Sequence, residues 1–184
     1  RSMREVAMWT PPTTTPARNF PDWNPVMEIH GPWRVTFDPA ARGPGEVQFP
    51  KLISWTTRPE DGIRFYSGTA TYRTTFHLPP SIGHLPSSID LGDVREIAEV
   101  RLNGKTLGIA WSIPFRAETA DALRAGDNTL EIEVVNFWPN RIIGDASLPE
   151  SQRRTKTNIR KLTADTPLIP SGLLGPVRLL SAEP

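Results

Sequence analysis

The sequence predicts an all-β fold, an antiparallel β-sandwich of the jelly-roll type with one or two short helical turns. Proline makes up 20 of the 184 residues, which is about twice its usual share of ~5%. Segments with helical periodicity are scarce, and about eight short runs of β-branched and aromatic residues alternate with turn-forming residues. The strand–helix–strand rhythm of a parallel sheet is missing, so we expect antiparallel pairing.

The charge balance and the lack of cysteine limit the classes of partner. The chain carries 21 basic and 20 acidic residues, so its formal net charge of +1 gives no overall field for nucleic acid or an anionic membrane. No apolar run approaches the ~18 residues of a membrane-spanning helix. We therefore expect no nucleic acid and no membrane as partners. Without cysteine, disulfides and thiolate metal sites are excluded, and the compartment stays open.

The length predicts one domain preceded by an arm. A chain of 184 residues can bury one core but is too short for two ordinary domains with a linker. Residues 1–26 are rich in Pro and Thr and have little periodicity, which is typical of an arm or linker. Because this segment includes Trp9, Phe20 and Trp23, both a free linker and a docked arm stay open. We place the folded β-sandwich at residues 27–184.

Three strand regions are predicted in the first half of the domain. Residues 33–37 follow a Gly-Pro turn and alternate in hydrophobicity, so we expect a strand with one buried face. Residues 47–55 predict a short strand and an apolar connection. Residues 63–78 form the longest strand region, which two prolines end. One face of this region carries Ala70, Tyr72, Thr74 and Phe76.

The second half contains the clearest turn signal. Strands are predicted at residues 88–91 and 97–102, and Asn103-Gly104 follows directly. This pair indicates a tight hairpin, because such turns require positive φ at both central positions. The remaining expected elements are two helical turns and a last strand, at residues 119–124, 150–154 and 177–180.

A strand followed by a chemically rich loop is predicted at residues 128–145. Leu130, Ile132 and Val134 alternate with Glu131 and Glu133, which places the apolar set on one face of a sheet. The alternation stops at Asn136, and Pro139 cannot donate to a strand ladder. We therefore expect a loop that presents Phe137, Trp138, Asn140, Arg141 and Asp145.

This loop is the best candidate for a sugar-binding site. Such a site combines an aromatic ring, which stacks on the C–H face of the sugar, with polar side chains that bind the hydroxyl groups. Trp138 meets this requirement with Asn140, Arg141 and Asp145. In the alternative interpretation, the Arg and Asp brace the loop and the Trp closes the end of the sandwich. Further candidates for ligand binding are Trp55, Trp111 and Tyr66.

The sequence offers no catalytic residues, metal ligands or cofactor motif that we would assign. Glu131 and Glu133 lie ~6.7 Å apart on one strand face, within reach of the carboxylate pairs of glycosidases. Two glutamates on an exposed strand are nevertheless ordinary surface charges. The three histidines lie in different segments without ligand spacing, and the basic cluster lacks the aromatics of a nucleic-acid site. These residues are His30, His77 and His84, and Arg153, Arg154, Lys156, Arg160 and Lys161.

Several motifs resemble a known family of domains. Residues 66–73, 89–94, 98–105 and 126–130 resemble the galactose-binding-like, sugar-binding β-sandwich of glycoside hydrolases related to family 2. Asn-Phe-Trp-Pro-Asn-Arg at 136–141 and Pro-Ser-Gly-Leu-Leu-Gly-Pro at 170–176 resemble the accessory sandwich of the family 106 α-L-rhamnosidase group. The resemblance covers about residues 27–180, and the second set of motifs is narrower than the first.

The resemblance implies a jelly-roll module that packs on a catalytic (β/α)8 barrel or binds glycan beside it. It also implies a secreted or periplasmic location within a larger bacterial enzyme of polysaccharide degradation. No barrel is present in this sequence, so hydrolysis is not carried over. Many such sandwiches hold a structural calcium ion; because no clustered carboxylates are evident here, calcium stays open and is not part of the prediction, which includes no cofactor.

Our leading hypothesis is a non-catalytic carbohydrate-binding or accessory module that binds glycan weakly, with rhamnose-containing glycan favoured by the resemblance alone. The alternative is a structural interface domain that packs on the catalytic domain of the parent enzyme without binding sugar. This alternative predicts an apolar patch around Trp138 instead of a cleft with polar walls. A self-sufficient hydrolase that uses Glu131 is a third hypothesis.

Overall fold

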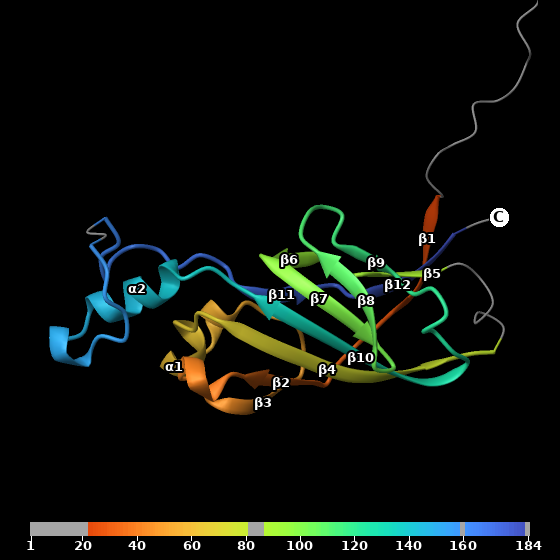
Figure 1. Cartoon of the computed structure of the whole chain (residues 1–184), viewed down its shortest axis with the longest axis horizontal. Helices are drawn as coiled ribbons and strands as arrows, with labels where there is room; N and C mark the ends of the chain where they lie inside the picture. Colours follow the sequence, from red (N-terminus) through yellow and green to blue (C-terminus); the bar gives the residue numbers. More distant parts are fainter. Residues whose placement is uncertain (1–21, 81–86, 159–160, 183–184) are drawn as a thin grey trace, which may run out of the picture.

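Two layers of antiparallel β-sheet, stacked face to face, form the body of the molecule (Figure 1). The structure is a computed structural model that describes residues 22–80, 87–158 and 161–182. The larger sheet has six strands, in the order β3 (Gly45–Phe49), β2 (Trp33–Phe37), β4 (Thr69–Leu78), β10 (Gly126–Val135), β7 (Ile97–Leu102) and β8 (Lys105–Ala110). The predicted fold class, an all-β antiparallel sandwich, is confirmed.

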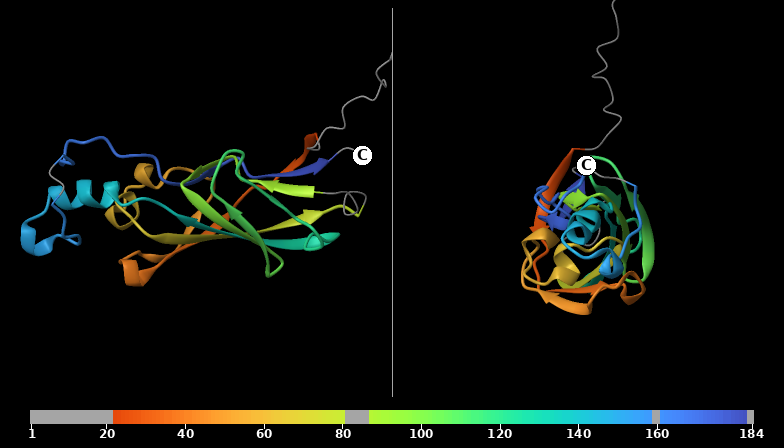
Figure 2. Two further views of the ribbon diagram at one scale, coloured as in Figure 1. Left: turned by 45° about the horizontal axis from the view of Figure 1, so that its top comes forward. Right: turned by 90° about the vertical axis from the view of Figure 1, so that its left-hand side faces the viewer.

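Two smaller sheets complete the second layer (Figure 2). The four-stranded sheet has the order β1 (Trp23–Glu28), β12 (Arg178–Ala182), β5 (Ser87–Asp90) and β9 (Arg116–Glu118). A two-stranded sheet pairs β11 (Gly172–Gly175) with β6 (Asp93–Arg95). Buried side chains of both layers belong to one hydrophobic core, which includes Val134 on β10 and Ile89 on β5.

The central strands β4 and β10 follow the period-two pattern of the sequence. Ile132 lies opposite Tyr72 and Val134 lies opposite Ala70, and all four side chains are buried. The intervening residues face outward, so one face of the pair is core and the other is wet. The first part of the predicted strand at 63–78 is different, because Asp61–Arg64 forms a short helix, α1, and β4 begins only at Thr69.

A cluster of aromatic rings fills the core where β2 and β4 meet the 3-10 helix at Trp55–Thr57. Phe37 packs with its ring centroid 5.3 Å from that of Trp55 and 5.0 Å from that of Tyr66, both edge to face. Trp55 donates its indole N–H to the Tyr72 hydroxyl oxygen over 2.5 Å. This oxygen also accepts the backbone N–H of Leu173 over 3.1 Å. The hydrogen bonds join both layers inside the core.

The Asn103-Gly104 hairpin between β7 and β8 is present as predicted. Asn103 has φ 52° and Gly104 has φ 81°, which matches the positive φ values that the turn requires. Asn103 also accepts the backbone N–H of Thr129 over 2.9 Å, so its side chain ties the turn to β10. The helical turn predicted at 119–124 is a tight turn closed by a hydrogen bond from Ala122 N–H to Thr119 O. At 150–154, Glu150–Gln152 forms a 3-10 helix.

The prediction of a loop at residues 136–145 is wrong from Pro139 onward, because Pro139–Ala146 forms the helix α2. Proline is well tolerated in the first turn of a helix, where its missing N–H would have no intrahelical partner. Pro139 therefore ends the strand ladder and also starts the helix. In Figure 1, α2 lies at the end of the molecule opposite to β1.

The N-terminal arm is only partly described. Strand β1 pairs with β12, with Trp23 opposite Ala182, so strand pairing begins before the predicted domain start at residue 27. Residues 1–21, with Trp9 and Phe20, lie outside the described residues, and the docking of that part of the arm stays a prediction.

Candidate functional site

The structure separates Trp138 from the polar side chains that were predicted to act with it. Trp138 occupies the N-cap position of α2 and is 49% exposed. Asn140, Arg141 and Asp145 lie on the helix itself and are only 3%, 7% and 2% exposed. They are buried because neighbouring segments cover α2, in which residues 140–145 are all buried. The predicted arrangement, a tryptophan beside polar residues on an open loop, is therefore wrong.

Asn140 holds the segment before β11 in place. Its amide nitrogen donates to the Ile169 carbonyl oxygen over 2.7 Å, and its amide oxygen accepts the Ile169 N–H over 2.8 Å. This pair of bonds satisfies the whole backbone of one residue. Asn140 is thus a bracing residue, and its polar atoms face the protein backbone.

Asp145 likewise holds the segment after the 3-10 helix at Glu150–Gln152 in place. One of its carboxylate oxygens accepts the backbone N–H of Arg154 over 2.9 Å and that of Thr155 over 2.7 Å. The Thr155 hydroxyl donates to the same oxygen over 2.7 Å. The alternative interpretation from the sequence, in which the loop residues brace each other, applies in altered form, because Asp145 binds the backbone of other segments.

Trp55 and Tyr66 are core residues, and their assignment as ligand-binding candidates is wrong. Both side chains are completely buried in the aromatic cluster. The Tyr66 hydroxyl donates to Thr69 O over 2.8 Å and accepts the N–H of Asp38 over 3.1 Å. Burial raises the pKa of the Tyr66 phenol. Neither ring offers a face to a ligand.

Trp111 directly follows β8 and is 72% exposed. On neighbouring strands of the same sheet, the exposed Ile97 of β7 lies opposite the exposed Val135 of β10. Large exposed apolar side chains thus follow one another across three strands. We call the full set the apolar ridge, and it consists of Ile97, Ile109, Trp111, Ile113, Val135, Phe137, Trp138 and Ile169.

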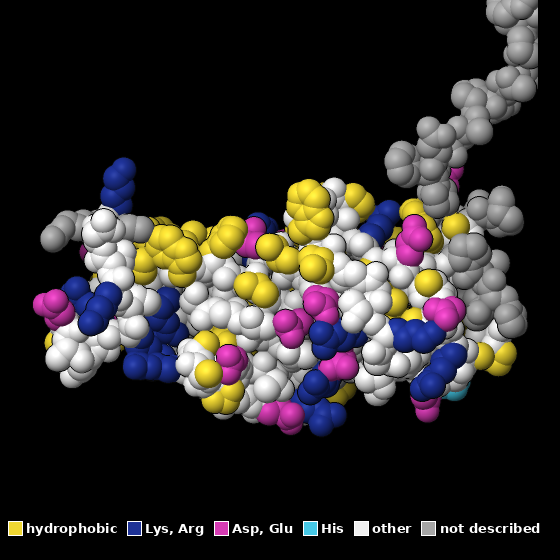
Figure 3. All heavy atoms as spheres, in the orientation of Figure 1, with side chains coloured by type: hydrophobic (Ala, Val, Ile, Leu, Met, Phe, Trp, Pro, Cys, Tyr) yellow, Lys and Arg dark blue, Asp and Glu magenta, His cyan; other side chains and the backbone are white. Residues whose placement is uncertain are grey.

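Figure 3 shows hydrophobic side chains along the upper edge of the molecule, between the end that carries α2 and the part that carries β8. Phe137 and Ile169 also line one small hollow together with Glu96. Contiguous exposed apolar surface is a common sign of a binding partner, and the interface hypothesis stays a prediction.

A hollow of about 780 Å³ lies on another side of α2. Its lining includes Asp145, Arg153, Thr155 and Lys156, and no aromatic residue among the described residues contributes to it. A sugar in this hollow would find hydrogen-bonding groups without a stacking ring.

Glu131 and Glu133 lie in a network of charges on the outer face of the six-stranded sheet. The Arg73 guanidinium donates to Glu131 over 2.5 Å, and Arg101 pairs with Glu99 on the neighbouring strand. These side chains line one small surface depression. The first ion pair is a cross-strand pair between β4 and β10, and the second joins two residues of β7.

The described histidines are dispersed. His77 contacts Asp127 over 2.8 Å, and His30 lies 3.5 Å from Glu28, while His84 lies outside the described residues. Within the described ranges, no three His, Cys, Asp or Glu side chains come together as a metal site would require. In the same ranges, no helix has the length and apolar character to cross a membrane.

Comparison with known proteins relates the chain to glycoside hydrolases. No protein-family model matches it. A putative β-glucuronidase of Formosa agariphila is 35% identical over 180 residues, which cover 84% of this chain and 15% of that protein. The solved structure of a rhamnosidase from Novosphingobium sp. PP1Y superposes with a TM-score of 0.81 and 38% identity, covering 91% of this chain and 16% of that one.

A β-glucuronidase of Ruminococcus gnavus, solved in complex with D-glucuronic acid, shares the fold at a TM-score of 0.61 with 19% identity. It covers 90% of this chain and 30% of that one. The chain thus spans only a small part of the hydrolases that it resembles. The predicted resemblance to a module of glycoside hydrolases, with a rhamnosidase among the relatives, agrees with these findings.

Proposed function

We propose that the chain acts as a non-catalytic accessory β-sandwich of a larger glycoside hydrolase and packs on the catalytic domain of that enzyme through the apolar ridge. The parent enzyme is of the α-L-rhamnosidase type, and the module is of the galactose-binding-like type. A secreted or periplasmic location belongs to the same proposal. The observation that carries the proposal is the exposure of Trp111, Phe137 and Trp138 beside aliphatic side chains.

Burial of apolar surface lowers the free energy, so an interface that covers the ridge would be stabilised. Burial of a large apolar side chain stabilises an interface by about 1.5–3 kcal/mol when it is complete. Interfaces between domains of one chain commonly bury about 600–1,500 Å². The relatives are about six times as long as this chain, so they contain further domains that could cover such a ridge.

The polar side chains near Trp138 support packing more than sugar binding. Asn140 and Asp145 use their polar groups for backbone hydrogen bonds. Removing these bonds to bind a sugar would leave buried backbone groups without partners, which costs about 1–3 kcal/mol for each group. The ridge therefore offers ring faces with few free polar partners.

The docking test mixes the chain with the separately produced remainder of the parent hydrolase and measures association by analytical ultracentrifugation. We expect a complex that Trp111→Ala with Phe137→Ala weakens by about tenfold or more, since two central aromatic contacts are lost. Thr75→Ala, on the outer face of β4, serves as the control and should leave the affinity unchanged. Absence of a complex with the unmodified chain would refute the docking proposal.

Weak glycan binding is the second candidate function, and the exposed rings of Trp111 and Trp138 favour it. One stacked sugar typically gives an affinity between about 1 μM and 1 mM. Affinity electrophoresis on a polysaccharide panel that includes rhamnose-containing glycans tests this function. Retardation should decrease in Trp111→Ala or Trp138→Ala. If no polysaccharide retards the unmodified chain, glycan binding is rejected and docking alone remains.

A further inference from the structure

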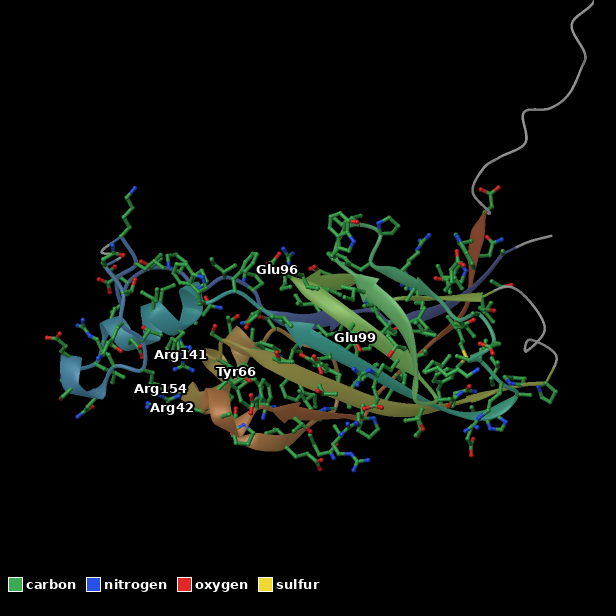
Figure 4. All side chains as sticks on the ribbon, viewed as in Figure 1. Arg42, Tyr66, Glu96, Glu99, Arg141 and Arg154 are labelled. Atoms are coloured by element: carbon green, nitrogen blue, oxygen red, sulfur yellow. The ribbon has the colours of Figure 1, made fainter. Side chains whose placement is uncertain are left out.

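Three arginines from distant parts of the chain meet below α2 (Figure 4). Arg42 follows the 3-10 helix at Pro39–Ala41, Arg141 lies on α2, and Arg154 follows the 3-10 helix at Glu150–Gln152. Both Arg42 and Arg154 interact electrostatically with Arg141. Figure 3 shows Lys and Arg side chains gathered at this end of the molecule. We call these three residues the arginine cluster.

Arg141 is the buried member of the arginine cluster. It is 7% exposed, and its Nη2 has no hydrogen-bond partner. Burial is the main cause that lowers the pKa of this guanidinium, and the positive charge of Arg154 is the next. Asp145 attracts Arg141 but makes no ion pair with it. The Asp145 carboxylate is thus a nearby counter-charge, but the buried Nη2 lacks a hydrogen bond, which is costly because a buried charge is normally both paired and hydrogen-bonded.

The other two members are exposed and leave the cluster open to solvent. Within the part of the chain that the structure describes, Arg42, Arg141 and Arg154 form no ion pair with a carboxylate. Six of the ten other arginines in the described ranges form such pairs; Arg58 with Glu60 and Arg116 with Asp90 are examples. The cluster therefore gathers three positive charges against one nearby carboxylate, that of Asp145.

The backbone around the cluster is held in place. Asp145 accepts the backbone N–H of Arg154, and the N–H of Arg42 donates to Pro39 O over 2.9 Å. Arg42 adopts the left-handed conformation with φ 59°. The side chains thus start from fixed points on three segments. Their convergence is a property of the folded chain, because more than a hundred residues separate Arg42 from Arg154.

We propose that the arginine cluster binds a small oxyanion, with the guanidinium of Arg141 as its innermost group. Guanidinium groups present a planar fork of donors that matches the paired oxygens of carboxylate, sulfate or phosphate. Arg42 and Arg154 complete the site from the solvent side. The chemistry is shared by two sources, a sugar acid and an inorganic oxyanion. This proposal does not depend on the apolar ridge, which consists of other residues.

The test measures binding to the folded 184-residue chain by isothermal titration calorimetry at constant ionic strength. The probes are D-glucuronate and sodium sulfate, and D-glucose and sodium chloride are the uncharged and halide controls. We expect saturable binding of glucuronate, sulfate or both, with no saturable binding of either control. Binding of glucuronate alone assigns the site to a sugar acid, and binding of sulfate alone assigns it to an inorganic oxyanion.

Arg154→Gln should weaken that binding by about tenfold, the usual effect of removing one charge-assisted hydrogen bond. Arg34→Gln is the matched control, because Arg34 is an exposed arginine on β2 and the substitution removes the same charge. Arg141→Lys, which keeps the charge but removes the fork, should also weaken binding. If it does not fold by circular dichroism, Arg42→Gln replaces it.

Three results would overturn the proposal. The first is a lack of saturable binding of both oxyanions to the unmodified chain. The second is unchanged affinity in a folded Arg154→Gln protein. The third is an equal loss in Arg34→Gln, which would show that net charge alone accounts for the binding.

Discussion

Aromatic side chains occupy two regions of this molecule in opposite ways. In the core, Trp55, Tyr66 and Tyr72 are completely buried and their polar atoms have partners. On the apolar ridge, Trp111 and Trp138 expose much of their ring surface. The comparison teaches that a large aromatic residue in a connection between strands is compatible with two outcomes. It can be buried in the core, or it can be exposed for contact with a partner. The local sequence alone does not distinguish the two, because both kinds of tryptophan follow a strand region.

The largest expected effect is that of Trp55→Ala in the core. The substitution removes a completely buried ring and leaves the Tyr72 hydroxyl without the indole donor. We expect the free energy of unfolding to fall by about 3–5 kcal/mol. Urea denaturation followed by circular dichroism measures this change. A loss near that of a surface substitution would contradict the assignment of Trp55 to the core.

The next effect is that of Asn140→Ala on α2. The Ile169 N–H and carbonyl would both lose their side-chain partner, so we expect a loss of about 1–3 kcal/mol in unfolding free energy. Asn158→Ala is the control, because Asn158 is exposed and the same atoms are removed. If both variants lose equal stability, the brace between α2 and Ile169 contributes nothing specific.

The third effect concerns alkaline pH and Tyr72. Burial raises the pKa of the Tyr72 phenol far above its usual value of about 10. Because the folded protein holds this proton more tightly than the unfolded chain, the stabilisation is complete below about pH 10 and is lost as the pH rises further. Urea midpoints measured from neutral pH to about pH 11 should decrease more steeply for the unmodified chain than for Tyr72→Phe. Parallel curves would show that Tyr72 does not titrate in this way.

The smallest effect on stability is expected on the ridge. Trp111→Ala should change the free energy of unfolding of the isolated chain by about 0.5 kcal/mol or less, since the ring makes little core contact. The same thermal or urea denaturation as for Trp55→Ala gives the direct comparison. A loss above about 2 kcal/mol would mean that Trp111 packs within the domain and is not available to a partner.

The strands were predictable because their signal is local. Alternation along β10 and the Asn103-Gly104 turn depend on neighbouring residues, and the structure has both where the sequence placed them. Helix α2 was missed because Pro139 stops a ladder and starts a helix equally well. The sequence alone does not show which of these two roles applies.

The candidate site was less predictable, since it depends on contacts between distant segments. Trp138 was recognised, but Asn140 and Asp145 were expected to face a ligand, and their partners lie at Ile169 and Thr155. The sequence singled out Arg141 and Arg154 separately, but it did not show that they meet each other and Arg42, which comes from the other half of the chain. Burial of Trp55 likewise follows from its packing with Phe37 and Tyr66.

Strand β8 is one border of the six-stranded sheet, so its outer backbone groups have no neighbouring strand. The register between β7 and β8 shifts at Val100 and Arg101, close to Gly108, whose φ is 141°. Such a bulge bends and twists a border strand away from the regular geometry that another strand would require. Edge-to-edge strand pairing and fibril formation are therefore disfavoured at this edge strand, although Ile109 exposes an apolar side chain there. We therefore expect this edge of the sheet to contact other molecules through its apolar side chains and not through backbone hydrogen bonds.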